Sequence, residues 1–190
     1  NERAARMAGL ELTMWYYAVA SWRRARHVPE GCRAFSSHRQ SGYVAVVGVM
    51  LGLVAIEAFA VHLMMSRFSL PAACILTALS VYAIIWMVAE ARAVVLNPLL
   101  VGNDELVARW GMLARERVPL GLIAWVGECE PAVPRKERLD LAAMGGRAVW
   151  IELAEPLEVR GITGKRRTVR ALKVSPDEPV AFKQALCLRG

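Results

Sequence analysis

The sequence has few of the residues that build metal centres and catalytic triads. Only three histidines occur in 190 residues, and none has a serine, cysteine or carboxylate partner in a context that suggests a triad. The four cysteines lie far apart, with no C-x-x-C pair and no histidine at metal-ligand spacing: Cys32, Cys74, Cys129 and Cys187. These absences argue against hydrolase chemistry and against a zinc site. We therefore expect a protein that is not an enzyme, with free thiols, no metal and no cofactor.

Charge is nearly missing from residues 43–89, where Glu57 and Arg67 are the only formally charged side chains. The chain as a whole is 56% hydrophobic and 22% charged, so apolar and charged residues are segregated along it. Two apolar runs, Tyr43–Met65 and Leu70–Val95, exceed the roughly 20 residues needed to cross about 30 Å of hydrocarbon. We expect an integral membrane protein with two transmembrane helices, and not a hairpin buried in a soluble protein.

The two runs are separated only by Ser66-Arg67-Phe68-Ser69, so they must be antiparallel neighbours with both chain ends on one side. Residues 1–42 contain seven Arg and three Glu, and further bases follow the second run, whereas the connecting loop has one Arg. Because cytoplasmic segments carry an excess of Lys and Arg, both termini are predicted to be cytoplasmic. Gly48 and Gly52 form a small-x-x-x-small pair that predicts close packing on small residues of the second helix, within residues 72–80.

Two polar residues interrupt the first run. Glu57 lies past its middle, where a carboxylate is costly unless it is protonated, paired or turned toward protein. His62 follows five residues later, about 140° around the helix, so the two side chains could touch only loosely. One interpretation is a neutral Glu57 hydrogen-bonded to Ser80 or Tyr82, with His62 near the outer interface. The others are a polar contact to another transmembrane subunit, a proton-handling pair, or His62 as an axial ligand of a haem or pigment.

An aromatic segment, residues 10–22, precedes the first run and is too short to cross a membrane. It ends in three bases, Arg23, Arg24 and Arg26. Aromatic rings beside a basic run suit the headgroup layer, which favours an interfacial helix. The alternative is a helix packed on the soluble domain without lipid contact. Four side chains share one helical face and are expected to be packed: Met7, Leu10, Met14 and Tyr17. Pro29-Glu30-Gly31 then ends the helix, and a polar stretch continues to Gly42.

After Asn97-Pro98 the pattern changes to short apolar runs separated by turn residues. Leu99–Val101 and Glu105–Trp110 flank Gly102-Asn103-Asp104, which is typical of a hairpin turn. Further strands are expected in a run through Val118 and at Leu122–Val126, Ala148–Leu153, Leu157–Val159 and Thr168–Val174, with turns at Pro156 and Gly161–Gly164. About seven short strands predict a small β-sandwich or barrel.

The last segment carries the signals of a helix start. Ser175-Pro176-Asp177-Glu178 offers a serine N-cap, a proline at the first helical position and a glutamate at the third, which together form a capping box. The predicted helix buries Val180, Phe182, Ala185 and Leu186. The expected fold class is a membrane α-helical hairpin plus a small, mainly-β domain with a C-terminal helix. The expected divisions are an N-terminal segment (1–42), the hairpin (43–96) and a cytoplasmic domain (97–190).

Residues 105–126 resemble the core of bacterial pleckstrin-homology-like (PH-like) membrane proteins. In that family two transmembrane helices precede a strand ending in R-x-G, a second strand, and then I-P-L-x-x-I-x-x-V. Here Arg109-Trp110-Gly111 and Val118-Pro119-Leu120 through Val126 match these motifs. The resemblance implies a PH-like barrel at a bacterial inner membrane. It implies no catalytic residues, because the family has none in common. Residues 131–147 depart from the pattern as an insertion.

A basic cluster lies near the end of the domain. Gly161–Arg166 faintly resembles a phosphate loop, but Val159 and Arg166 replace the glycine and the Ser or Thr that such a loop needs, so we expect no nucleotide there. Four bases are expected to face solvent or anionic headgroups: Lys165, Arg166, Arg167 and Arg170. Four more extend this surface: Arg135, Lys136, Arg138 and Arg147. No aromatic platform accompanies them, so nucleic acid is not an expected partner.

The sequence as a whole favours a non-enzymatic membrane scaffold or accessory subunit of a larger complex. The expected partners are membrane lipids and other transmembrane subunits. Glu57 and His62 are the candidate contacts within the membrane. The candidate contacts to headgroups or partner proteins are Arg23, Arg24, Arg26, Lys165, Arg166, Arg167 and Arg170. The alternative function is a transport or proton-coupled protein that uses Glu57 within an oligomer.

Overall fold

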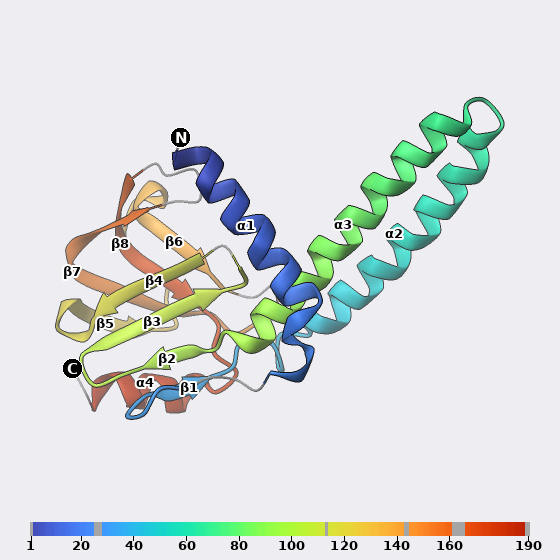
Figure 1. Cartoon of the computed structure of the whole chain (residues 1–190). Coiled ribbons are helices and arrows are strands. Elements are labelled where there is room, and N and C mark those ends of the chain that lie inside the picture. The colour runs from blue at the N-terminus through green and yellow to red at the C-terminus, as the bar shows by residue number, and fades with distance from the viewer. Residues whose placement is uncertain (1, 25–27, 113, 143–144, 161–165, 189–190) are drawn as a thin grey trace. The chain divides into compact units, whose positions relative to one another are not determined.

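The computed structural model describes residues 2–24, 28–112, 114–142, 145–160 and 166–188 (Figure 1). The chain divides into two compact units. The helical unit comprises Asn1–Arg24 and Val44–Arg92, and the sheet unit comprises Ala25–Tyr43 and Ala93–Gly190. Residues 1–42 are thus shared between the two units.

The helical unit contains two long helices and a shorter one. These are α1 (Glu2–Ala18), α2 (Tyr43–Ser66) and α3 (Leu70–Leu96), with a 3₁₀ turn, η1 (Ala20–Arg23), after α1. The helices α2 and α3 are long and apolar enough to cross a membrane, with mean hydropathies of 2.5 and 2.2. Their ends agree with the predicted ends to within one residue, so the prediction of two long apolar helices is confirmed.

The two long helices pack along a seam that repeats about every three and a half residues. The half-buried seam positions on α2 are Val47, Leu51, Val54, Ala58, Val61 and Met65. The seam positions on α3 are smaller: Ala73, Thr77 and Ser80. Near the loop, larger side chains of α2 therefore lie against small residues of α3. Toward its other end α3 carries larger half-buried side chains, such as Ile84 and Met87.

Gly48 and Gly52 lie outside this seam. Both are exposed, and a Cβ atom added at either position would meet no atom within 4 Å. The expectation that this pair forms the packing face of the hairpin is wrong, whereas the expected small residues of the second helix do take part. The contact between the two helices therefore does not use the glycine pair.

One face of α1 is buried. Met14 is fully buried, Leu10 and Tyr17 are half-buried, and Met7 is 62% exposed. The predicted packed face is therefore right at three positions and wrong at Met7. Glu11, one turn after Met7, is hydrogen-bonded to Tyr82 of α3.

The described part of the sheet unit contains eight strands in two four-stranded sheets. The first sheet has the spatial order β1 (Arg33–Phe35), β2 (Leu99–Val101), β3 (Glu105–Trp110) and β4 (Ala114–Pro119), all antiparallel. The second has the order β5 (Ile123–Gly127), β7 (Val149–Arg160), β8 (Arg166–Val174) and β6 (Arg138–Leu141), in which β6 and β8 are parallel. The 3₁₀ turns η2 (Leu120–Leu122) and η3 (Arg135–Glu137) precede β5 and β6, and α4 (Pro179–Cys187) ends the fold.

The core of this unit is formed by side chains from both sheets and from α4. Leu106 from the first sheet, Ile151 and Leu172 from the second, and Phe182 from α4 are fully buried in one cluster. The rings of Phe35 and Phe182 meet edge to face, with their centroids 5.2 Å apart. The prediction of a small sheet domain with a C-terminal helix is therefore confirmed.

Two strands were not expected from the sequence. β1 lies before the first long helix, in a stretch expected to be irregular, and it pairs with β2 about 65 residues later in the chain. β6 lies within residues 131–147, and it pairs in parallel with β8. Both strands are short and depend on partners distant in sequence, so local patterns do not indicate them.

Two boundaries differ from the prediction. The segments expected as separate strands around Pro156 form the single strand β7, whose register with β8 shifts between Glu152 and Leu157. Such an irregularity accommodates a proline within a strand. The final helix begins at Pro179, with Glu178 at the N-cap position and no side-chain cap, so the predicted capping box at Ser175–Glu178 is wrong. Phe182, Ala185 and Leu186 are buried as expected, but Val180 is 61% exposed.

Candidate functional site

Glu57 lies on the exposed flank of α2. It is about 14 residues, or roughly 21 Å, from the start of that helix, and about a quarter turn away from the seam with α3. Its side chain is exposed, as are those of Leu53, Ile56 and Ala60 around it. It makes no hydrogen bond or ion pair with any residue that the structure describes. A carboxyl group without a partner thus lies on the outer surface of an apolar helix.

The two hydroxyl groups expected beside Glu57 are engaged elsewhere. The Ser80 hydroxyl donates to the Leu76 carbonyl at 3.1 Å. The Tyr82 hydroxyl donates to Glu11 Oε1 at 2.6 Å. Each hydroxyl has a single hydrogen to donate, so neither donates to Glu57. The expected hydrogen bond from Glu57 to the second helix is therefore not formed in this structure.

His62 faces the seam and binds α3. Its Nδ1 atom is 2.7 Å from the Thr77 hydroxyl oxygen, and that hydroxyl donates to the Ala73 carbonyl at 2.9 Å. Because the threonine hydrogen is used by Ala73, Nδ1 of His62 carries the hydrogen and donates to Thr77. His62 therefore holds the two helices together and is not paired with Glu57. The described residues contain no group of three His, Cys, Asp or Glu that could hold a metal ion.

A second carboxylate, Glu11, joins α1 to α3. It accepts the Tyr82 hydroxyl, and the Tyr82 oxygen accepts a hydrogen bond from Trp86 Nε1 at 3.0 Å. At the other end of this junction, Arg92 donates to the Ser21 carbonyl at 3.0 Å, and its guanidinium lies 4.8 Å from the centre of the Trp22 ring. We call these contacts the α1–α3 junction.

The sequence itself distinguishes Glu11. Glu11 is the only charged residue in the run from Leu10 to Trp22, just as Glu57 is the only acidic one in α2. The two carboxylates, each the only acidic group in an apolar helical segment, differ in their hydrogen bonding. Glu11 has a donor within the chain, and Glu57 has none among the described residues.

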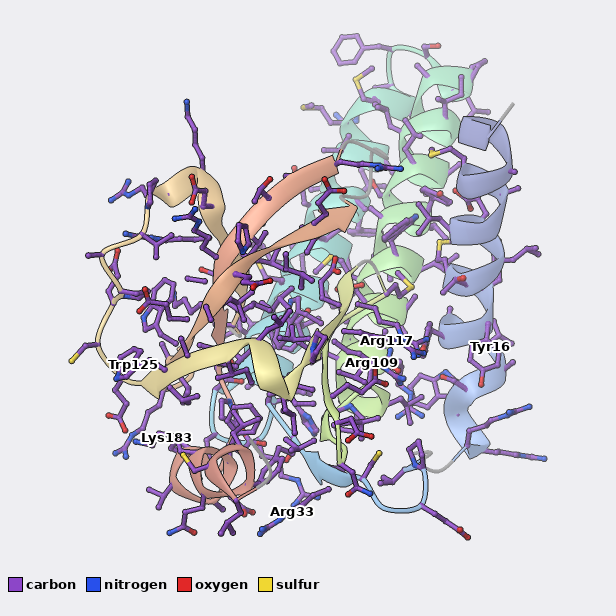
Figure 2. All side chains as sticks on the ribbon, turned by 90° about the vertical axis from the view of Figure 1, so that its left-hand side faces the viewer. Tyr16, Arg33, Arg109, Arg117, Trp125 and Lys183 are labelled. Atoms are coloured by element: carbon purple, nitrogen blue, oxygen red, sulfur yellow. The ribbon has the colours of Figure 1, made fainter. Side chains whose placement is uncertain are left out.

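The basic residues predicted near the aromatic segment lie at its exposed end. Arg23 and Arg24 are both exposed. The guanidinium of Arg24 lies 5.8 Å from the centre of the Tyr16 ring on α1, and Tyr16 is labelled in Figure 2. The third predicted base, Arg26, lies outside the described residues.

The basic cluster of the sheet unit is largely ion-paired. Arg166 lies 3.5 Å from Glu158, and Arg170 lies 3.4 Å from Glu137. Arg167 donates to the Arg138 carbonyl at 3.1 Å. The remaining member, Lys165, and the predicted turn at 161–164 lie outside the described residues. Since the paired carboxylates offset the positive charge, the attraction of Arg166 and Arg170 for anionic headgroups is reduced.

Asp177 anchors the segment that leads into α2. Its carboxylate accepts the backbone N–H groups of Arg39 at 3.1 Å and Gln40 at 2.9 Å. Its own N–H donates to the Ser36 carbonyl at 2.7 Å. Burial opposes ionisation of this side chain, but the donors from Gln40, Ser36 and Arg39 outweigh it and hold the pKa of Asp177 below its ordinary value.

Two hollows open on the sheet unit. One, of about 140 Å³, is lined by Leu120, Ile123, Ala124, Trp125, Val126, Leu186 and Cys187. The other, of about 200 Å³, is lined by Ala34, Phe35, Ser36, Arg39, Asp177 and Glu178. The first has no charged side chain in its lining. In the second, the carboxylate of Asp177 is already bound by backbone donors.

The candidate site is therefore the exposed flank of α2 around Glu57, supported by a hairpin whose own polar groups are paired. Comparisons of this chain with protein-family models, with curated proteins and with solved structures find no match.

Proposed function

We propose that this chain is a non-enzymatic integral membrane protein, a scaffold or accessory subunit whose hairpin binds another transmembrane helix through Glu57. The observation that carries the proposal is the exposed carboxyl group of Glu57 on an otherwise apolar helix surface. In hydrocarbon an acidic side chain near the centre of a span costs roughly 3 kcal/mol. A donor from a second subunit would remove most of that cost.

The internal contacts of the hairpin support an outward role for Glu57. His62, Thr77 and Ser80 satisfy one another or nearby backbone groups within the hairpin. The seam is complete without Glu57, so its position on the flank serves no packing purpose inside the chain. Large apolar side chains beside Glu57, Leu53 and Ile56, are 56% and 70% exposed, which suits contact with lipid or another helix.

For the sheet unit we propose a PH-like fold, placed with both chain ends on the cytoplasmic side of a bacterial inner membrane. Two four-stranded sheets, antiparallel except for the β6–β8 pair, and a C-terminal helix support this proposal. Gly111, the glycine of the R-x-G motif, has φ 61° between β3 and β4, where a side chain would be strained. The Asn97 side chain donates to the Gly111 carbonyl at 3.2 Å and fixes this turn. In the proposed scaffold this unit binds a partner protein at the membrane surface.

The alternative, a proton-coupled protein that uses Glu57, receives less support. A proton relay needs neighbouring groups that exchange protons, and His62 is hydrogen-bonded to Thr77 on another face of α2. No other titratable side chain of the described residues contacts Glu57. The exposed flank fits a polar contact between subunits better than it fits a relay.

The proposal is tested by photo-crosslinking in native membranes. A photoreactive amino acid at Leu53 or Ala60, on the flank that carries Glu57, is expected to crosslink to another membrane protein. The same group at Gly48, on the other side of α2, serves as the control and should crosslink much less. Glu57→Leu should reduce co-purification of the partner about threefold to thirtyfold, as expected for a lost hydrogen bond between helices. Equal crosslinking at Leu53 and Gly48, or a lone monomer after mild extraction, would falsify the proposal.

A further inference from the structure

The outer face of α1 is apolar although it is not packed within the helical unit. Its exposed side chains recur at helical spacing: Leu12 (72%), Trp15 (48%), Tyr16 (38%), Val19 (66%) and, in η1, Trp22 (60%). They lie on the side of the helix opposite to Met14, which is fully buried. The helix thus has two opposite apolar faces, of which only one is buried.

The charges of this segment are placed at its end and not on the apolar face. Glu11, the only charged residue between Leu10 and Trp22, is hydrogen-bonded to Tyr82 of α3. The next charged residues are Arg23 and Arg24, both exposed and directly after Trp22. An apolar, aromatic face that ends in two cations matches a membrane interface, where rings lie at the headgroup level and cations meet lipid phosphates.

The α1–α3 junction sets the direction of α1 relative to the hairpin. Contacts at Glu11 and at Ser21–Trp22 hold one stretch of α1 and η1 against α3. Beyond that stretch α1 diverges from the hairpin and does not run along it, as Figure 1 shows. If α2 and α3 cross the bilayer, a helix that diverges from them near the end that carries Arg92 lies close to the plane of the nearer leaflet.

We propose that α1 is an interfacial helix whose outer face, Leu12 to Trp22, inserts into an anionic leaflet, with Arg23 and Arg24 binding lipid phosphates. This inference rests on the proposed insertion of the hairpin. It does not depend on whether Glu57 has a partner subunit.

Depth measurements with spin labels test the proposal in the full chain reconstituted in vesicles of phosphatidylcholine and phosphatidylglycerol. Cysteines are placed at Val19, Ile56 and Val180 in a chain whose four native cysteines are serine. The native side chains at these positions have similar exposures of 66%, 70% and 61%. Accessibility to oxygen and to a water-soluble nickel complex should place position 56 deep in the bilayer. Position 19 should lie about 5–10 Å below the headgroups, and position 180 in water.

The outcomes separate this inference from the proposed function. Water-like accessibility at both 19 and 56 would overturn the insertion of the hairpin and of α1 together. A deep label at 56 with a water-like label at 19 overturns only the interfacial helix. A label at 19 that is shielded from both reagents indicates that protein covers the face, and spin dilution with unlabelled chain identifies a second copy. If the Val19 variant does not fold, Leu12→Cys replaces it.

Lipid charge is tested with a fluorophore at Val19→Cys and brominated lipids. Brominated phosphatidylglycerol should quench it more strongly than brominated phosphatidylcholine at the same mole fraction. The double variant Arg23→Gln/Arg24→Gln should lower this preference by up to about fivefold for each arginine. Arg33→Gln/Arg115→Gln, which removes the same charge from exposed positions of the sheet unit outside its basic cluster, is the control and should leave it unchanged. An unchanged preference in the first variant contradicts the role of the two arginines.

Discussion

The two units of this chain bury apolar side chains in opposite ways. In the sheet unit, Leu106, Ile151 and Phe182 are enclosed between two sheets and a helix. In the helical unit, Ile56, Phe59 and other large apolar side chains point outward, and the seam between α2 and α3 is only half-buried. The sheet unit encloses its large apolar side chains, whereas the helical unit leaves many of them exposed on its surface. Substitutions at matched positions of the two units test this contrast.

The largest effect is expected at Phe182, the largest fully buried side chain. Phe182→Ala should destabilise the sheet unit by about 3–5 kcal/mol, because it leaves a cavity beside Phe35 and the β7–β8 core. Thermal unfolding of the reconstituted chain, followed by near-ultraviolet circular dichroism, measures the change. Val180→Ala on the exposed side of α4 is the control, with an expected change within about 0.5 kcal/mol. Equal effects at the two positions would contradict an enclosed core.

A hydrogen-bonded carboxylate gives the next largest effect. Asp177→Ala removes the acceptor of two backbone N–H groups and should cost about 2 kcal/mol, after allowance for partial access of solvent. Because the pKa of Asp177 is lower in the folded state than in the unfolded state, its contribution is complete above the unfolded pKa, about 4. It is lost as the pH falls through the folded pKa.

The pH dependence can be measured by thermal unfolding between pH 7 and pH 3. The wild type should lose more stability on acidification than Asp177→Asn does. Glu116 supplies a contrast of opposite sign. Burial raises its pKa, only partly offset by the charge of Arg167, so its protonation stabilises the fold as the pH falls. Glu116→Gln should therefore lose more stability on acidification than the wild type. Parallel pH curves for all three chains would show that neither carboxylate is linked to folding.

A substitution of Glu57 tests the stability of the helical unit. Glu57→Leu should stabilise the isolated hairpin in lipid by about 2 kcal/mol, because it removes an unpaired carboxyl group from an apolar surface. The same substitution should weaken assembly with a partner. Resistance to unfolding by dodecyl sulfate in mixed micelles measures the first effect, and Ile56→Leu is the matched control. A loss of resistance in Glu57→Leu would mean that the carboxyl group has a stabilising partner within the chain.

The sequence predicted the features that depend on neighbouring residues and missed those that depend on distant ones. The ends of α2 and α3 follow from continuous apolar runs, and the β2–β3 turn follows from Gly102-Asn103-Asp104. By contrast, β1 pairs with β2, and the whole hairpin lies between these two strands in the sequence. No local pattern therefore indicates β1. The capping box at Ser175–Glu178 also failed: Asp177 in that segment binds the distant Arg39 and Gln40, and the helix begins only at Pro179.

The candidate site shows the same limit. Glu57 stood out because it is alone in an apolar run, and the sequence could also show that His62 is not on its face. The hydrogen bond from His62 to Thr77 and the bond from Tyr82 to Glu11 join segments that are 15 and 71 residues apart. Because His62 and Tyr82 are bonded to Thr77 and Glu11, neither donates to Glu57. Only the three-dimensional structure shows these contacts.

The smallest effect on stability is expected at the α1–α3 junction, where polar contacts hold part of the helical unit together. Tyr82→Phe removes the donor to Glu11 and the acceptor of Trp86, but it keeps the ring, so α3 should remain folded and inserted. We expect α1 to loosen locally, since Arg92 still holds Ser21 and Trp22. Hydrogen exchange at the backbone of residues 7–14 should increase, while exchange in α2 and in the sheet unit stays the same. Unchanged exchange at residues 7–14 would mean that the outer face of α1, and not the bond to Tyr82, holds this helix in place.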